Sequence, residues 1–255
     1  MVVDLRVDCT HLTDADYKLI GSVKSLKSIS ISGKPMLDRH LALLSELSGL
    51  EAFQINGTQL TDDGYRHFAA FSKLRRLSLF HPSRDVEGFT GEGLAHLKSL
   101  TNLRRLTFAG ASTGDAAFKA VGELTQLEEF SQWHNWESPD AIKHLVGLPL
   151  KKFKLGQRLP NQNSKRPASL DDTTLAEIAK MKSLEVLEMQ EARFSYAGLV
   201  QLKSSHNLKT IKLKWVDVTE RDIEKLRSAM PGVAIEWEPL KDDEEKSLLV
   251  KKLRL

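Results

Sequence analysis

The feature that most constrains this chain is a short apolar pattern that recurs along almost its whole length. Ten pairs of residues two positions apart are spaced, first member to first member, by 24, 24, 24, 29, 24, 23, 34, 24 and 22 residues. All members are apolar except Gln132. A fixed period of this length indicates a repeat protein. The pairs are Leu5/Val7, Ile29/Ile31, Phe53/Ile55, Leu77/Leu79, Leu106/Phe108, Phe130/Gln132, Phe153/Leu155, Leu187/Met189, Ile211/Leu213 and Val233/Ile235.

Each repeat predicts one strand and one helix. A spacing of two puts both apolar side chains on one face of a strand. Another leucine precedes most pairs by three residues, so the unit reads L-x-x-L-x-L. Ahead of it apolar residues recur every three positions, as at Tyr65, Phe68 and Phe71, which predicts a short helix with one apolar stripe. Stacked units would bury a shared core between a parallel sheet and a layer of helices.

Most of the predicted helices also carry a start signal. A side-chain oxygen stands four positions before the stripe in seven of nine units. Such an oxygen accepts a hydrogen bond from the first turn and is worth about 1 kcal/mol. Gly114 and Leu37 hold this position in the other two units. The seven predicted caps are Thr13, Thr61, Thr90, Ser138, Asp171, Ser195 and Thr219.

The pattern resembles that of leucine-rich-repeat proteins. Residues 60–65 (LTDDGY) and 89–94 (FTGEGL) resemble a bacterial variety that repeats an L-T-D-x-G-L helix start. They are also similar to the helix-bearing repeats of ribonuclease inhibitor and of F-box receptors. The resemblance implies an α/β fold: a curved right-handed solenoid of about nine to ten units, with a parallel sheet on the concave face and helices on the convex face. It also implies protein recognition on the concave face, without catalysis or a cofactor.

We expect the solenoid to cover residues 1–238, followed by a charged tail over residues 239–255. That tail would form a capping helix, dock a partner or be disordered. The family's usual Asn or Cys after the strand is matched only by Asn135, so the other turns need another way to satisfy their backbone groups. At the first strand three outcomes stay open: Asp4, Arg6 and Asp8 blunt the edge, the strand pairs with another chain, or an upstream segment covers it.

The residues between and beside the apolar pairs point away from the core. Phe80 and Trp133 fall in one row with Ala109 and Gly156. Aromatic and arginine side chains are enriched at interface hot spots, so we predict a recognition patch for a protein or an acidic peptide. The alternative is that the two aromatic residues pack beneath long loops. The predicted partner-binding residues are Arg76, Phe80, Arg105, Glu129, Trp133, Lys152 and Lys154.

Two insertions interrupt the regular period, and we expect both at the same edge of the solenoid, as binding loops or as tolerated ornaments. Residues 80–88 hold the first, and residues 156–169 hold the second. Gln132 replaces an apolar strand residue, so we expect that strand to end early or distort, with Trp136 filling the gap. The basic and histidine residues of the insertions are His81, Arg84, Arg158, Lys165 and Arg166.

Other function classes find little support. Lys and Arg exceed Asp and Glu by three, the longest apolar runs are four residues, and Cys9 is the only cysteine. We therefore expect a cytoplasmic protein with no metal, disulfide framework or nucleotide-binding loop.

One alternative to the protein-binding function is binding of a polyanion or nucleic acid, and another is a substrate adaptor in a ubiquitin-ligase-like complex. The basic residues for the polyanion alternative are Arg76, Arg105, Lys152, Lys154, Lys212 and Lys214.

Overall fold

The computed structural model describes residues 2–33, 36–157, 169–240 and 247. It divides into two compact units, Met1–Leu127 and Glu128–Leu255, which are described separately. Of the insertion residues, Arg158, Lys165 and Arg166 lie outside the described residues, as does most of the predicted tail.

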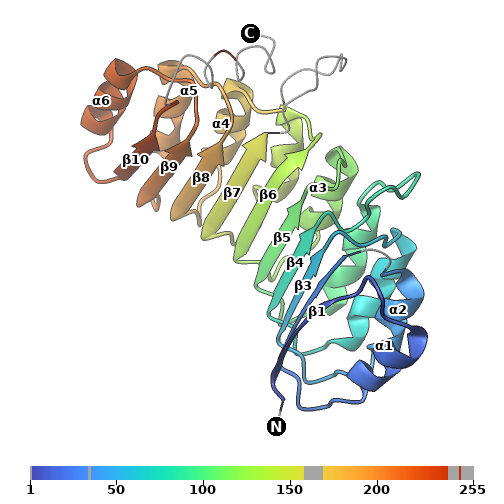
Figure 1. The fold of residues 1–255 in the computed structure, drawn as a ribbon. Coiled ribbons are helices and arrows are strands. Elements are labelled where there is room, and N and C mark those ends of the chain that lie inside the picture. The colour runs from blue at the N-terminus through green and yellow to red at the C-terminus, as the bar shows by residue number, and fades with distance from the viewer. Residues whose placement is uncertain (1, 34–35, 158–168, 241–246, 248–255) are drawn as a thin grey trace. The chain divides into compact units, whose positions relative to one another are not determined.

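The first unit alternates strands and helices along the chain (Figure 1). Its strands lie side by side in chain order, and all four neighbouring pairs are parallel. The strands are β1 (Asp4–Asp8), β2 (Ser28–Ser32), β3 (Ala52–Asn56), β4 (Arg76–Phe80) and β5 (Arg105–Ala109). The helices are α1 (Asp14–Gly21), α2 (Asp38–Leu43), η1 (Asp63–Ala70), η2 (Glu92–Ser99) and α3 (Asp115–Gly122).

The second unit repeats this arrangement, again with parallel neighbours in chain order. Its strands are β6 (Glu129–Asn135), β7 (Lys152–Gln157), β8 (Val186–Gln190), β9 (Thr210–Lys214) and β10 (Ala234–Glu238). Its helices are η3 (Pro139–Leu145), α4 (Asp172–Ile178), α5 (Tyr196–Leu199), η4 (Val200–Ser204) and α6 (Glu220–Ala229).

Strand register places equivalent residues of successive repeats beside each other. Phe53 pairs with Leu77, and Leu77 pairs with Leu106, so the apolar pairs form continuous rows within the unit. Every pair member from β2 to β9 is buried, the polar Gln132 included. The predicted α/β leucine-rich-repeat solenoid, with a parallel sheet on one side and helices on the other, is therefore confirmed. The exceptions lie at the ends: Leu5, Val7 and Val233 are only half-buried.

The helical layer differs from the prediction in helix type. Four of its elements, η1 to η4, are 3₁₀ helices rather than α-helices. In η1 the stripe residues Tyr65, Phe68 and Phe71 repeat at three residues, which fits the three residues per turn of a 3₁₀ helix, although α1 carries the same spacing as an α-helix. All three rings are buried and meet edge to face, with centroids of successive rings 5.6 and 6.2 Å apart.

An aspartate of one repeat holds the helix start of the next. The Asp62 carboxylate accepts hydrogen bonds from the Thr90 N–H at 2.8 Å, the Thr90 hydroxyl at 3.0 Å and the Gly93 N–H at 2.9 Å. Asp38 accepts from the N–H and hydroxyl of Thr61 at 3.0 and 2.6 Å. Asp172 does the same for the next repeat's serine, and we call these three carboxylates the aspartate ladder. The ladder satisfies backbone N–H groups at the starts of three helices.

The strand that contains Gln132 shows the second of the two expected outcomes, a distortion. β6 is distorted, as expected, with a register shift between Trp133 and Asn135, but it does not end early. Gln132 is fully buried and donates to the buried Glu137 carboxylate, while its own carbonyl oxygen accepts from Asn135 at 3.4 Å. Trp136 is half-buried, and its role in filling the gap stays a prediction. Polar partners from the same strand and the following loop satisfy the Gln132 amide.

Candidate functional site

In each unit the strands have one face that none of that unit's described helices covers, which we call the open face (Figure 1). Alternation along each strand sends the residues between the buried pairs to this face. In the first unit we define patch 1 as Arg76, Phe80, His81, Arg84 and Arg105. In the second unit we define patch 2 as Glu129, Trp133, Lys152 and Lys154. Together the two patches contain all the predicted binding residues that the structure describes.

Patch 1 joins strand residues to the first insertion. Arg76 pairs in register with Arg105, and both side chains are exposed. Phe80 is half-buried, and its ring centroid lies 4.0 Å from that of His81. An Arg84 guanidinium nitrogen lies 3.3 Å from His81 Nδ1. The strand residues and the insertion therefore present aromatic and cationic groups close together.

The first insertion is anchored at its base to the preceding repeat. The Leu60 N–H and the Thr58 hydroxyl both donate to the Pro82 carbonyl, at 2.9 and 2.7 Å. The Arg84 N–H donates to the Thr58 carbonyl at 2.8 Å. The His81 ring lies where a side chain at Gly110 would be, since a Cβ there would fall 2.4 Å from the ring. These contacts hold the predicted loop residues in defined positions.

Patch 2 centres on Trp133. The Lys154 Nζ lies 5.0 Å from the centroid of the Trp133 ring, within cation–π range. Trp133 pairs in register with Gly156, and a Cβ on Gly156 would fall 2.8 Å from the Trp133 Cβ. The missing side chain leaves room for the indole and for Gln190, whose Cγ would lie 2.6 Å from the same Cβ. Glu129 and Lys152 pair in register on the same face.

Three lysines of the second open face are matched by glutamates on the next strand. Lys152 Nζ lies 2.7 Å from Glu188, and Lys212 Nζ lies 2.8 Å from Glu236. The hydrogen bond and charge of Glu236 raise the pKa of Lys212. Lys214 lies 3.6 Å from Glu238 and 4.4 Å from the Trp215 ring centroid. This face therefore carries alternating paired charges rather than a basic stripe.

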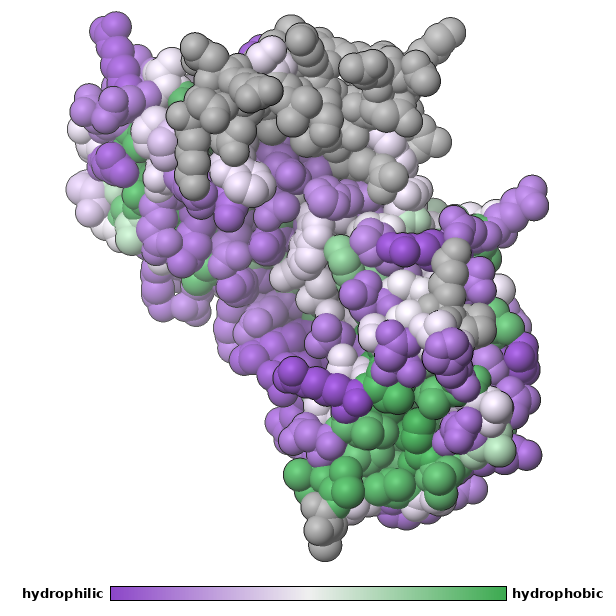
Figure 2. Space-filling view, viewed as in Figure 1, coloured by the Kyte–Doolittle hydropathy of each residue, from purple (hydrophilic) through white to green (hydrophobic). Residues whose placement is uncertain are grey.

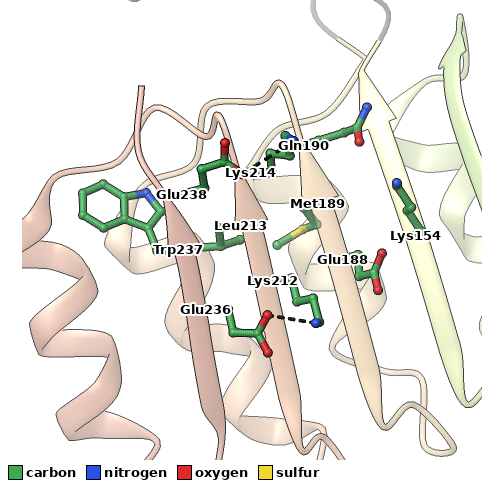
Figure 3. A pocket seen from close by; sticks show the side chains of 10 residues that line it. All are labelled: Lys154, Glu188, Met189, Gln190, Lys212, Leu213, Lys214, Glu236, Trp237 and Glu238. Carbon is green, nitrogen blue, oxygen red and sulfur yellow. Dashed lines mark ion pairs between the residues drawn. The ribbon is translucent and has the colours of Figure 1, made fainter. Parts of the chain in front are cut away.

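A shallow hollow opens on this charged face (Figure 3). Lys154, Glu188 and Gln190 come from β7 and β8, while Lys212, Glu236 and their neighbours come from β9 and β10. Sequence reasoning missed the part that the glutamates play in pairing these lysines, because a pair between strands depends on register. It also missed the His134–Glu191 pair, 3.0 Å apart, because the two residues are 57 positions apart.

Phe80 and Trp133 are both half-buried. Each ring contacts close neighbours, as the packing alternative expected, and each also reaches solvent, as the recognition hypothesis requires. Ala109, which the sequence placed in their outward row, is fully buried. The binding role of the two patches stays a prediction.

Features of other protein classes are not seen among the described residues. Within those ranges, no three His, Cys, Asp or Glu side chains are grouped so that they could hold a metal ion. None of the helices described there combines the length and hydropathy that a membrane span requires. The thiol of Cys9 is buried and donates to the Gly33 carbonyl at 2.9 Å.

The sequence matches no family model and no curated protein. The structure is similar to an internalin (inlF) of Listeria monocytogenes, with a TM-score of 0.53 and 14% identity over 92% of this chain and 61% of that one. Internalin C2 of the same organism gives 0.53 and 14% over 89% and 84%. TLR13, solved as a complex with ssRNA13, gives 0.57 and 16% over 95% of this chain and 34% of that one.

Two of these three proteins are therefore substantially longer than this chain, which spans 61% and 34% of them. At 14% to 16% identity, the similarity is evidence for the fold alone. It agrees with the parallel strands in chain order, the period near 24 residues and the buried L-x-x-L-x-L positions. The chain has the fold of a leucine-rich-repeat solenoid.

Proposed function

We propose that this protein is a non-enzymatic scaffold that binds a protein or peptide partner on the open faces of its sheets. The observation that carries the proposal is the half-exposed aromatic residue in each patch, Phe80 or Trp133, next to cationic side chains on a face without helices. Rigid aromatic and arginine side chains supply much of the affinity in protein interfaces. The internalin and TLR13 similarities support a recognition scaffold in general terms.

Patch 1 favours an acidic partner segment. Arg76 and Arg105 lie side by side, and the open-face positions of β2 to β5 hold no Asp or Glu. The neighbouring side chains at those positions are small or uncharged, such as Ser30, Gln54 and Thr107. A carboxylate-rich segment crossing this face would form charge-assisted hydrogen bonds to guanidinium groups. In patch 2 the ion pairs favour a partner of mixed charge.

The polyanion alternative has weaker support. Lys152, Lys212 and Lys214 already face glutamates across the strands, and these carboxylates would repel phosphates. The ssRNA in the TLR13 complex belongs to a protein of which this chain spans 34%. Strong heparin retention that collapses between low and moderate salt would favour this alternative over protein binding. The ubiquitin-ligase adaptor stays an untested hypothesis that needs a partner to supply the F-box.

The test is affinity capture from the native host with matched variants. Arg76→Glu, Phe80→Ala and Trp133→Ala alter the open faces. Arg66→Ala alters the exposed surface of η1 and serves as the helix-side control. We expect the three open-face variants to lose a specifically captured protein, each keeping the melting temperature of the wild type, while the control retains that protein.

Arg76→Glu keeps the test decisive if an aromatic variant unfolds, because the Arg76 side chain is exposed. Loss of the captured protein in the helix-side control alone, or its retention in all three open-face variants, would contradict the proposal.

A further inference from the structure

The first unit has an exposed apolar surface at β1 and α1, its first strand and helix. Figure 2 shows a hydrophobic patch where Figure 1 places β1 and α1. Val2, Val3 and Leu19 are 54%, 44% and 68% exposed. Other apolar side chains of β1, α1 and the adjoining segments are half-exposed: Leu5, Val7, Leu12, Ile20 and Val23. The second repeat buries the residues equivalent to these five half-exposed ones: Ile29, Ile31, Met36, Leu44 and Leu47.

The backbone of β1 is also available for pairing. The Val3 carbonyl accepts from the Lys27 and Ser28 N–H groups of the second repeat, and the Cys9 N–H donates to the Ser32 carbonyl. Backbone groups alternate in direction along a strand, so odd-numbered residues face β2 and even-numbered residues face the other edge. In the first unit's described residues no strand pairs with that edge. The N–H and C=O groups of Asp4, Arg6 and Asp8 therefore line it.

The side chains of β1 make this edge self-complementary. If a second copy pairs antiparallel with Leu5 opposite Leu5, then Asp4 stands opposite Arg6, and Val3 stands opposite Val7. The two Asp4–Arg6 pairs would lie together on the open face, where neither residue has an ion pair with another described residue. The apolar pairs would lie on the helix side. Opposite charges and apolar side chains across antiparallel strands both stabilise the pairing.

Neighbouring registers are less favourable. With Arg6 opposite Arg6, Asp4 would face Asp8, and every charged pair would be of like sign. With Val7 opposite Val7, Arg6 would face Asp8, whose carboxylate already accepts from the Thr10 N–H at 2.8 Å. That register would also place Leu5 opposite Cys9, beyond the end of the strand.

We propose that this chain forms a two-fold symmetric dimer through antiparallel pairing of β1 with β1 of a second copy, centred on Leu5. Residues paired in an antiparallel ladder point to the same face, so both α1 helices lie on one side of the joined sheets. The exposed Leu19 and the half-exposed Ile20 would then add apolar surface to the interface. A two-fold interface of this kind is isologous and closes without forming fibres.

Sedimentation of the full chain over a concentration series tests the dimer. Arg6→Asp sets two carboxylates opposite each other, and Asp4→Arg sets two guanidinium groups opposite each other, twice per dimer in each case. We expect each single variant to raise the dimer dissociation constant by about tenfold or more. The double variant Asp4→Arg/Arg6→Asp exchanges the charges and should restore dimerisation. Both residues are exposed, so circular dichroism should show an unchanged fold.

A disulfide trap tests the register independently. Leu5 occupies a non-hydrogen-bonded position, where paired Cα atoms lie about 4.5 Å apart, within disulfide range. Leu5→Cys should therefore form a covalent dimer under mild oxidation, whereas Val7→Cys should not. The wild type is the control, because its single Cys9 is buried.

Three results would overturn the proposal: a monomer at all concentrations, a dimer that Arg6→Asp leaves unchanged, or a double variant that does not recover. Cross-linking of Val7→Cys in place of Leu5→Cys would overturn the register centred on Leu5.

Discussion

At the scale of single residues, the glycines of the helix starts are explained by the aspartate ladder. A Cβ on Gly64 would fall 1.9 Å from an Asp38 carboxylate oxygen, and one on Gly198 would fall 2.1 Å from an Asp172 oxygen. At Gly93 the obstacle is backbone, because the Asp62 carbonyl oxygen would lie 2.2 Å away. The L-T-D-x-G-L pattern thus combines a cap, a carboxylate for the next repeat and a residue without a side chain.

Gly93→Ala should therefore destabilise the protein by about 1–3 kcal/mol, because the backbone of the preceding repeat must move to admit a methyl group. Gly147→Ala is the matched control, since nothing lies within 4 Å of its Cβ position. Urea unfolding of both variants measures the difference. Equal free energies of unfolding for the two variants would contradict the close approach of Asp62 to Gly93.

His40 shows how the ladder adapts where the sequence lacks both the cap and the glycine. Leu37 stands at the cap position, and its N–H donates to His40 Nδ1 at 3.0 Å. The other ring nitrogen, Nε2, therefore carries the proton toward the Asp14 carboxylate, 3.0 Å away. The imidazole also stacks on the Tyr17 ring at 4.4 Å between centroids. One buried side chain thus replaces the hydroxyl and the glycine of other repeats.

At the scale of elements, alternation along each strand separates the core from the open face. In β5, Leu106 is buried while the adjacent Thr107 is half-exposed on the other face. Leu106→Ala should lower the free energy of unfolding by about 2–5 kcal/mol, as expected for a core truncation. Thr107→Ala should change it by no more than about 0.5 kcal/mol. Chemical denaturation of both variants checks the contrast, and similar losses for the two would mean that the faces are assigned wrongly.

Strands were easier to predict than helices for a physical reason. A spacing of two is a strand signature by itself, so the strands around Ile29/Ile31 and Phe53/Ile55 could be placed from sequence. A spacing of three is shared by α- and 3₁₀ helices, so the type of η1 and η2 could not be decided in advance. In β6, the polar partners of Gln132 lie at and just after a register shift that the repeat pattern does not encode.

At the scale of the whole molecule, the sequence predicted which residues share a face but not what they contact. Arg76, Trp133 and Lys154 lie on open faces as expected. The ion pairs that match Lys152 and Lys212 depend on strand register, which brings together residues far apart in the chain. Likewise, the exposed apolar surface at β1 and α1 depends on how the repeats stack in three dimensions. From the sequence alone, three outcomes stayed open for β1: charged side chains that blunt its edge, pairing with another chain, or cover by an upstream segment.

The most direct test of the central claim is thiol labelling of native variants that each carry one introduced cysteine besides the buried Cys9, because the claim is that adjacent strand residues face opposite environments. Cysteines at exposed Arg76 and Lys214 should react rapidly. Cysteines at buried Leu77 and Leu213 should react at least about 100-fold more slowly, through opening of the fold. Equal rates within either pair would contradict an account in which the leucines form the interior of each unit and the residues between them form its exposed open face.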